Sequence, residues 1–346
     1  MALDHSATLG LDVSDRFSNY CLLDSDGEVI EEGRLRTTEA VLRQRFSGLN
    51  CTLVLEAGLH SPWISRLFQD MHYCVIVANP RRVQLIAQSN RKNDRSDAET
   101  LARLGRADPR LLGPVIHRAS QAQADLAVVR ARNSTIAART LLINHVRGAV
   151  KSAGGRLPSG DAHTFHKKVK PHIPSALLPA MEPLVDAIES LSERIKEHDR
   201  RIKELIDVRY PECRVLQQVA GVGPLISLCF ILTIGDPTRF RSSRDLGPYL
   251  GLVPRQRESG DSSPALRISK AGNGLLRLLL VNGAQYILGF RGPDSDLRRW
   301  GLAKAVGGKA AKKRAIVGVA RRLAVLLHHL WLTGEVYDPF HHSAAA

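Results

Sequence analysis

The chain has 346 residues, of which 44% are hydrophobic and 24% charged, so its composition suits a globular protein of two or three domains and excludes a disordered or fibrous chain. The formal net charge of +15 is unevenly spread: residues 1–115 hold 14 Lys and Arg against 15 Asp and Glu, whereas residues 213–346 hold 19 against 8. This asymmetry predicts a polyanionic partner, nucleic acid first and an anionic membrane second.

The N-terminal part is expected to alternate strands and helices. The predicted strands are 8–13, 20–24, 29–35, 52–56 and 73–78, and the predicted helices are 38–46, 61–71 and 80–88. Ser61 is expected to cap the second helix, with Pro62 at its first position. Three strands followed by helix, strand, helix, strand and helix are typical of a ribonuclease-H-like α/β domain, which we assign to residues 1–115.

Cysteine usage and hydropathy favour a cytoplasmic protein. Cys21, Cys51 and Cys74 lie in apolar, strand-like runs without a CxxC pair, so buried thiols are expected. The N-terminus lacks the basic and apolar regions of a signal peptide. Leu225–Ile234 is uncharged but too short to span a bilayer, and it predicts a buried helix. No membrane partner is therefore expected.

Residues 116–212 have the periodicity of two long helices. One seam, mostly apolar, steps by four and three residues from Ala122 to Val150, and a second steps likewise from Leu184 to Leu205. With a Gly, Pro, His and Lys-rich link between them, the two seams predict an antiparallel coiled-coil hairpin for spacing or dimerisation. The alternative is two ordinary amphipathic helices packed on a globular core.

Residues 213–346 are predicted to form a third, mostly helical domain with a glycine- and serine-rich loop at 254–264. Gly221 and Gly223, followed by Pro224, resemble the hairpin of a helix-hairpin-helix element, whose amides approach a phosphate. A tight turn between two helices explains the same residues equally well.

A basic helical run follows in the same domain, and phosphate contact is its favoured interpretation over a solvated face. Its residues are Lys309, Lys312, Lys313 and Arg314, with Arg321 and Arg322 beyond them. Trp300 and Trp331 are predicted to be core residues and not base-stacking platforms.

Four carboxylates form the candidate active site. Asp12 lies at the end of the first predicted strand, and Glu56 ends the fourth. Asp94 and Asp97 are three residues apart, which on a helix places both on one face. Acids from three separate segments could surround one or two Mg²⁺ ions, which prefer oxygen ligands and catalyse phosphodiester displacement. Singly, each acid could instead cap a turn or pair with a basic neighbour.

With these acids, the motifs GLDVSDRF, LVLEAG and KNDRSDAETLARL resemble those of the DEDD transposases of bacterial insertion sequences, relatives of the Piv-type invertases. The C-terminal segments from VAGVGP to RQRESG and RISKAGNGLLRLLLVNGA extend the resemblance over nearly the whole chain. Two departures are Asn93, where threonine is common, and ESGDSS, where the family often has S-S-G-G.

The resemblance implies a RuvC-like N-terminal domain that binds Mg²⁺ or Mn²⁺ through the four acids. It also implies a C-terminal serine nucleophile that bonds covalently to a DNA phosphate, a homodimer or homotetramer, and DNA ends and target as substrates. Some members of the family are guided by a bridge RNA, so a noncoding RNA partner is expected, in a bacterial, nucleoid-associated setting.

The serine is expected to be Ser259. A nucleophilic serine needs exposure and nearby positive charge, and Arg255 and Arg257 precede this one. Lys270 follows the same loop and is a further expected phosphate contact. Ser242 is the main competitor, but it is predicted to serve as a helix N-cap. A plain loop serine is the alternative for Ser259.

The preferred function is therefore transposition or site-specific recombination. A RuvC-like, structure-selective endonuclease that uses metal-activated water is the first alternative, and it gives the serine loop no chemical role. A non-catalytic nucleic-acid-binding protein is the second.

Overall fold

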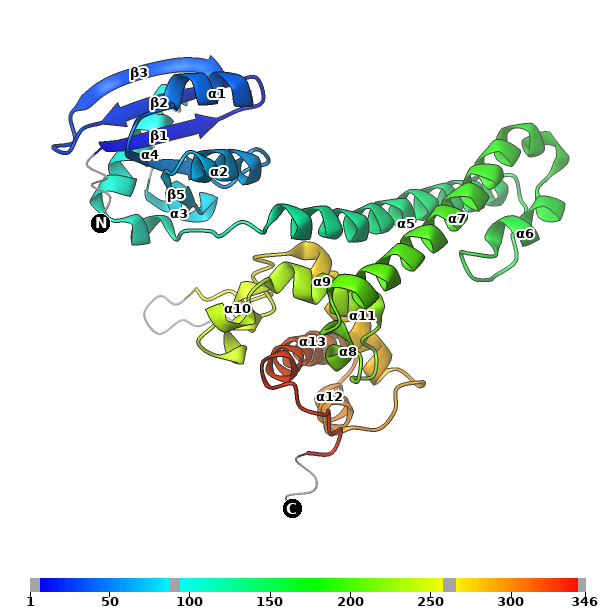
Figure 1. Ribbon diagram of the computed structural model, residues 1–346. Coiled ribbons are helices and arrows are strands. Elements are labelled where there is room, and N and C mark those ends of the chain that lie inside the picture. Colours follow the sequence, from blue (N-terminus) through cyan, green and yellow to red (C-terminus); the bar gives the residue numbers. More distant parts are fainter. Residues whose placement is uncertain (1–6, 87–93, 258–265, 342–346) are drawn as a thin grey trace. The chain divides into compact units, whose positions relative to one another are not determined.

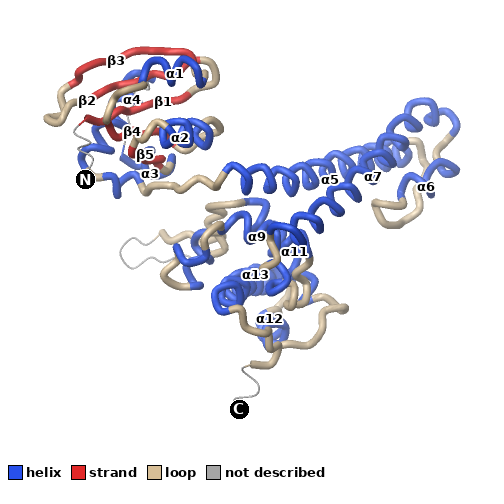
Figure 2. Tube along the Cα trace, viewed as in Figure 1, coloured by secondary structure: helices blue, strands red, loops and turns tan. Residues whose placement is uncertain are grey.

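The computed structural model describes residues 7–86, 94–257 and 266–341 (Figures 1 and 2). The chain forms two compact units, Met1–Ala119 and Ser120–Ala346. The helical middle and the C-terminal part belong to the same unit, and the division into three domains stays a prediction.

A five-stranded mixed sheet is the centre of the first unit, and all five predicted strands are present. They are β1 (Ala7–Val13), β2 (Phe17–Leu23), β3 (Val29–Arg36), β4 (Cys51–Glu56) and β5 (Cys74–Ala78). The order across the sheet is β3-β2-β1-β4-β5, with β2 antiparallel to β1 and β3, and β4 parallel to β1 and β5. This mixed α/β arrangement is compatible with a ribonuclease-H-like domain.

Helices cover both faces of this sheet. They are α1 (Glu39–Phe46), α2 (Ser61–Asp70), α3 (Pro80–Ile86) and α4 (Asp94–Ala107), followed by the short 3₁₀ helix η1 (Pro109–Leu112). Leu11 and Leu55 point to one face, where they form a core with Phe46 and Phe68 of α1 and α2. Side chains alternate along a strand, so the residues next to Leu11 and next to Leu55 point to the opposite face of the sheet, which α4 covers.

Two local predictions in this unit are wrong. His60, and not Ser61, is the N-cap of α2. The Ser61 hydroxyl is engaged with Gly58, donating to its carbonyl oxygen and accepting from its amide at 2.9 Å each. Cys74 is exposed because it opens β5, which pairs with β4 alone at the sheet edge, whereas Cys21 and Cys51 are buried as predicted.

The second unit is all helical apart from one isolated bridge between described residues. Its helices are α5 (Ser120–Ser152), α6 (Phe165–Val169), α7 (Leu178–Arg209), α8 (Cys213–Leu216), α9 (Pro224–Ile234), α10 (Leu246–Tyr249), α11 (Gly274–Leu288), α12 (Asp296–Lys304) and α13 (Lys309–Thr333). Short 3₁₀ turns lie at η2 (Lys170–His172), η3 (Ser175–Leu177), η4 (Pro237–Arg239) and η5 (Ser243–Asp245). The core is built largely from α9, α11 and α13.

Helix α13 is the single described helix with the length and apolar composition to cross a bilayer. It instead serves as a core helix, since Val319, Leu323 and Leu327 are fully buried in the largest hydrophobic cluster. The predicted buried helix at 225–234 is confirmed as α9, from which nine residues are buried.

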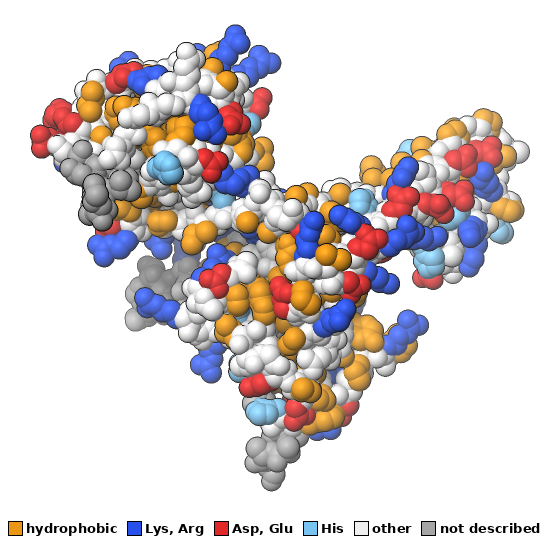
Figure 3. Space-filling view, viewed as in Figure 1, with side chains coloured by type: hydrophobic (Ala, Val, Ile, Leu, Met, Phe, Trp, Pro, Cys, Tyr) orange, Lys and Arg blue, Asp and Glu red, His pale blue; other side chains and the backbone are white. Residues whose placement is uncertain are grey.

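The long helices α5 and α7 run antiparallel along each other (Figure 1). Arg132 of α5 pairs with Asp199 of α7, and further along Arg139 donates to the Ser192 hydroxyl at 3.1 Å. Their outward faces carry interspersed acidic and basic side chains (Figure 3). The pair is therefore held by a mostly apolar seam with polar links and is solvated outside.

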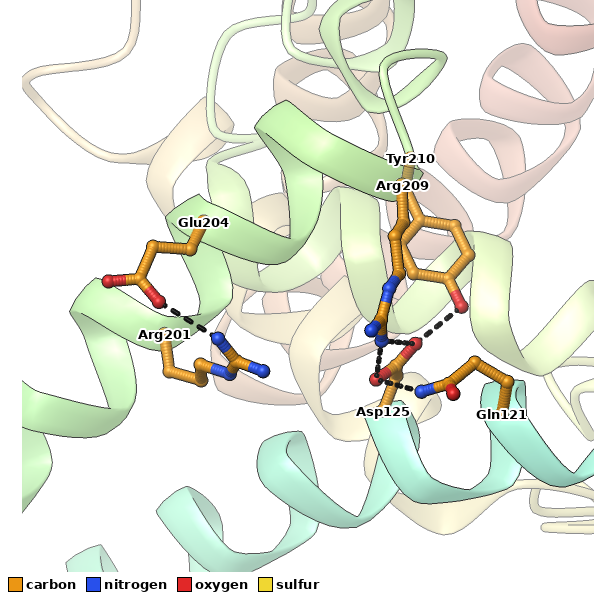
Figure 4. A network of polar contacts seen from close by, with 6 residues as sticks. All are labelled: Gln121, Asp125, Arg201, Glu204, Arg209 and Tyr210. Atoms are coloured by element: carbon orange, nitrogen blue, oxygen red, sulfur yellow. Dashed lines mark hydrogen bonds and ion pairs between the residues drawn. The ribbon is translucent and has the colours of Figure 1, made fainter.

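A buried carboxylate ties the start of α5 to the end of α7 (Figure 4). Asp125 is 4% exposed and accepts hydrogen bonds from Arg209 at 2.9 Å, from the Tyr210 hydroxyl at 2.8 Å and from Gln121 at 3.1 Å. Burial, together with the bond to Asp125, raises the pKa of Tyr210 to about 12. A carboxylate this well partnered is stable in a buried position.

We expect Asp125→Ala to lower the free energy of unfolding of the second unit by about 2–4 kcal/mol, because its donors are left without a buried acceptor. Urea unfolding followed by circular dichroism measures this. Glu204→Ala is the matched control, since its pair with Arg201 is half exposed on α7 and should contribute less than about 0.5 kcal/mol. Equal losses in the two variants would contradict the prediction.

Candidate active site

Asp12 and Glu56 occupy equivalent positions on neighbouring strands. Strands β1 and β4 are parallel, with Leu11 opposite Leu55, so Asp12 and Glu56 are the next residues on each strand. Both therefore lie at the carboxyl ends of their strands and, by the period of two, on the sheet face opposite the leucines. Both are half-buried.

Helix α4 packs directly on that face because β1 carries a glycine there. A methyl group on Gly10 would lie 2.0 Å from the carbonyl oxygen of Ala98 and 2.7 Å from the amide nitrogen of Ala102. A methyl group on Gly105 would lie 2.3 Å from Cγ2 of the Val54 side chain on β4. The close approach requires glycine at both positions and fixes α4 against β1 and β4.

The direction of α4 brings its first turn to the acidic end of the sheet. Near its C-terminus, Arg103 donates to the Gly27 carbonyl at 3.1 Å and Arg106 to that of Ser25, in the turn between β2 and β3. That turn lies at the other end of β1, since Leu23 pairs with Thr8. The first residues of α4 therefore lie toward Asp12.

Asp94 and Asp97 are both in this first turn. Asp97 is half-buried, and the side chain of Asp94 lies outside the described part of the structure. Between them, Arg95 forms an ion pair with Glu32 of β3, which anchors the first turn to the sheet. The backbone thus brings all four predicted acidic positions to one end of one face.

Among the side chains that the structure describes, no three His, Cys, Asp or Glu residues are close enough to hold a metal ion. The carboxylates of the four predicted acids are chemically suited to a hard cation, since Mg²⁺ and Mn²⁺ prefer oxygen ligands of this kind. The three described acids do not complete such a site by themselves.

Hydrogen bonds hold the loop after Glu56 at the rim of this site. His60 accepts from the Trp63 indole at 3.1 Å, and its other nitrogen lies 3.3 Å from the Asp15 carboxylate. The Ser61 hydroxyl contacts His117 at 2.9 Å, and burial lowers the pKa of His117. Asp15, His60, Trp63 and His117 were not among the candidate residues, because their spacing follows no motif.

Ser259 lies outside the described residues, but both flanks of its loop are placed. Pro254 and Ile268 form an antiparallel bridge, and the Arg255 amide donates to the Arg267 carbonyl at 3.0 Å. The described residues on the two flanks of the loop therefore lie side by side. Its expected phosphate contacts Arg255, Arg257 and Lys270 are exposed.

Ser242 has the structural role predicted for it. Its hydroxyl accepts from the Arg244 amide at 3.2 Å, and Asp245 accepts from the Ser242 amide, which completes a capping box on η5. The adjacent Ser243 contacts buried His328 at 2.8 Å. Both hydroxyls are engaged in holding the turn before α10.

The two expected phosphate-binding elements of the second unit differ in exposure. Gly221 has φ +85°, and a methyl group on it would lie 2.9 Å from the Gly283 carbonyl oxygen of α11, whereas a methyl group on Gly223 would meet nothing within 4 Å. Gly221 therefore forms part of a tight turn between two helices. The basic residues Lys309, Lys312, Lys313 and Arg314 are all exposed in the first turns of α13.

Comparison with known proteins identifies the class. A DEDD transposase sequence model of the IS110 type matches residues 9–154, and that of the "Transposase IS116/IS110/IS902 family" matches residues 213–297. Acids at one end of a mixed sheet and these matches define a transposase, an enzyme that cuts DNA.

Similar whole proteins make the assignment narrower. The transposase for insertion sequence element IS1111A of Coxiella burnetii is 30% identical, over 95% of this chain and 90% of that protein. A probable family 20 transposase of Pseudomonas aeruginosa is 27% identical over 84% and 87%, and the transposase for element IS1328 of Yersinia enterocolitica is 28% identical over 86% and 92%. The chain belongs to the IS110-type family of DEDD transposases.

Proposed function

We propose that this transposase cuts and rejoins DNA strands with a metal-binding acid cluster and a serine nucleophile, as a site-specific recombinase. The observation that supports this most is the equivalent placement of Asp12 and Glu56 on adjacent parallel strands, with the first turn of α4 at the same end. These positions come from three separate segments of the chain, as the acids of a metal-binding cluster would.

Asp12, Glu56, Asp94 and Asp97 would hold Mg²⁺ or Mn²⁺. The bound metal supplies Lewis-acid stabilisation of the oxygens on the reacting phosphate. Gly10 and Gly105 hold α4 close to the sheet, and the Arg95–Glu32 pair orients its first turn. These residues position the acids and do not react.

Ser259 would attack the phosphate. A bond forms between its Oγ and phosphorus while the bond from phosphorus to the leaving sugar oxygen breaks, and the proton lost by the serine is balanced by one gained on that oxygen. The phosphodiester energy is retained in the adduct, so a second strand can later displace the serine. Arg255, Arg257 and Lys270 would neutralise the phosphate charge.

The partners proposed are the DNA ends of the element, its target and a noncoding guide RNA. The helices α5 and α7 would pair with a second copy as a coiled coil in a dimer or tetramer. Gly223 with Gly221, and Lys309, Lys312, Lys313 and Arg314, would contact phosphates. A bacterial cytoplasm, close to the nucleoid, is the setting that these partners require.

We expect Ser259→Ala to abolish the covalent protein–DNA adduct while leaving DNA binding within about twofold, because only the attacking oxygen is lost. Denaturing gels of labelled element ends measure the adduct. Ser262→Ala, in the same loop, is the matched control and should retain it. An adduct in the Ser259 variant would eliminate this serine. Free cut ends without an adduct in the unmodified protein would instead support a hydrolytic nuclease.

A further inference from the structure

A groove of about 1040 Å³ lies in the second unit, between α12, α13 and residues 335–341. Its apolar wall includes Leu297 and Leu326. The chain after α13 is tied across it, since the Asp296 amide donates to the Pro339 carbonyl at 2.8 Å and the Tyr337 amide to Gln218 at 3.0 Å. The groove has the size of a small-molecule site.

Three arginines from two separate segments reach this groove: Arg244 before α10, and Arg321 and Arg322 on α13. All three are exposed, and within residues 7–86, 94–257 and 266–341 none forms an ion pair with a carboxylate.

The acids of the groove are Asp296, Glu335 and Asp338. Glu335 lies 3.3 Å from His329, and Asp338 accepts from the Phe340 amide at 2.9 Å. Neither contact involves an arginine of the groove, so the three guanidinium groups are not ion-paired with these two carboxylates.

One of these arginines is stacked on an aromatic ring. The Arg322 guanidinium carbon lies 3.9 Å from the centroid of the Trp300 ring, and the ring edge abuts Gly318, where a methyl group would lie 3.0 Å away. Trp300 is partly buried and holds the guanidinium over its face. A guanidinium held this way presents its other face as a flat, cationic platform, on which unpaired bases stack.

We propose that this groove binds one unpaired nucleotide of a nucleic-acid strand, with its base on the Arg322–Trp300 stack and its phosphate between Arg244 and Arg321. This inference rests on one part of the proposed function, namely that the chain binds nucleic acid. Stacking accepts every base, so binding is independent of sequence. DNA and RNA share this chemistry, and either strand can supply the nucleotide.

The test uses the full chain without metal, so that failure of the acid cluster or of Ser259 does not affect it. Arg322→Lys keeps the charge but removes the planar stack. We expect it to weaken binding of fluorescein-labelled oligo-dT or oligo-rU by about tenfold, in fluorescence anisotropy, with duplex DNA binding unchanged. Comparing the two oligonucleotides shows which strand is preferred.

Arg291→Lys is the matched control, because Arg291 lies over exposed Phe290, 5.0 Å from its centroid, outside the groove. It should bind as the unmodified protein does. Light-induced crosslinking of oligo-5-iodo-dU should label residues that line the groove. Unchanged binding in the Arg322 variant, an equal loss in the Arg291 variant, or crosslinks that all map outside the groove would each overturn the proposal.

Discussion

Asp12→Asn is expected to lower the rate of DNA strand cleavage by about 10³-fold or more. The amide keeps the size of the side chain but removes a negative charge from the proposed metal site, where metal stabilisation of the transition state contributes several kcal/mol. Cleavage of labelled element ends in the presence of Mg²⁺ measures the rate. Because Asp12 is half-buried at a strand end, the fold should tolerate the amide.

Asp15→Asn is the control for this experiment. Asp15 is three residues further along, and its side chain is 91% exposed beside His60. Its cleavage rate should stay within about twofold of that of the unmodified protein, since an exposed charge is screened by solvent. Full cleavage by the Asp12 variant, with DNA binding intact, would mean that the acids at this end of the sheet are not the active site.

Gly10→Ala is expected to lower the free energy of unfolding of the first unit by about 3 kcal/mol and to remove cleavage activity as well. The added methyl group would lie 2.0 Å from the backbone oxygen of Ala98, so α4 must shift away from β1. That shift moves Asp94 and Asp97 relative to Asp12. Urea unfolding measures the stability, and the cleavage assay measures the consequence for the site.

Gly58→Ala serves as the comparison, because a methyl group on Gly58 would meet nothing within 4 Å. It lies two residues after Glu56 and should change stability by less than about 0.5 kcal/mol. If the Gly10 variant were as stable and active as the Gly58 variant, the close packing of α4 on β1 would be wrong.

Most of the first unit could be predicted from the sequence because its signals are local. The apolar runs around Leu11 and Leu55 predict strands that end in Asp12 and Glu56, and both strands are present. Ser61 was misassigned because a cap depends on which amide its hydroxyl reaches, and here that amide belongs to Gly58. Cys74 was misassigned because burial depends on the place of its strand in the sheet.

The sequence by itself predicted four candidate acids at strand and helix ends, and these remain candidates. Its motifs also carried the resemblance to DEDD transposases, and the family comparison confirms that resemblance. Spacing along a strand or helix and motif identity are carried by neighbouring residues, so no tertiary contact is needed to recognise them.

Only the tertiary structure decided that Asp12 and Glu56 share a register and that Gly10 admits α4. It also decided that Arg244 faces the same groove as Arg322 and Trp300. The residues in these pairs are 22 to 92 positions apart along the chain. They come together only when whole elements pack, because close approach between elements depends on the shape of both partners.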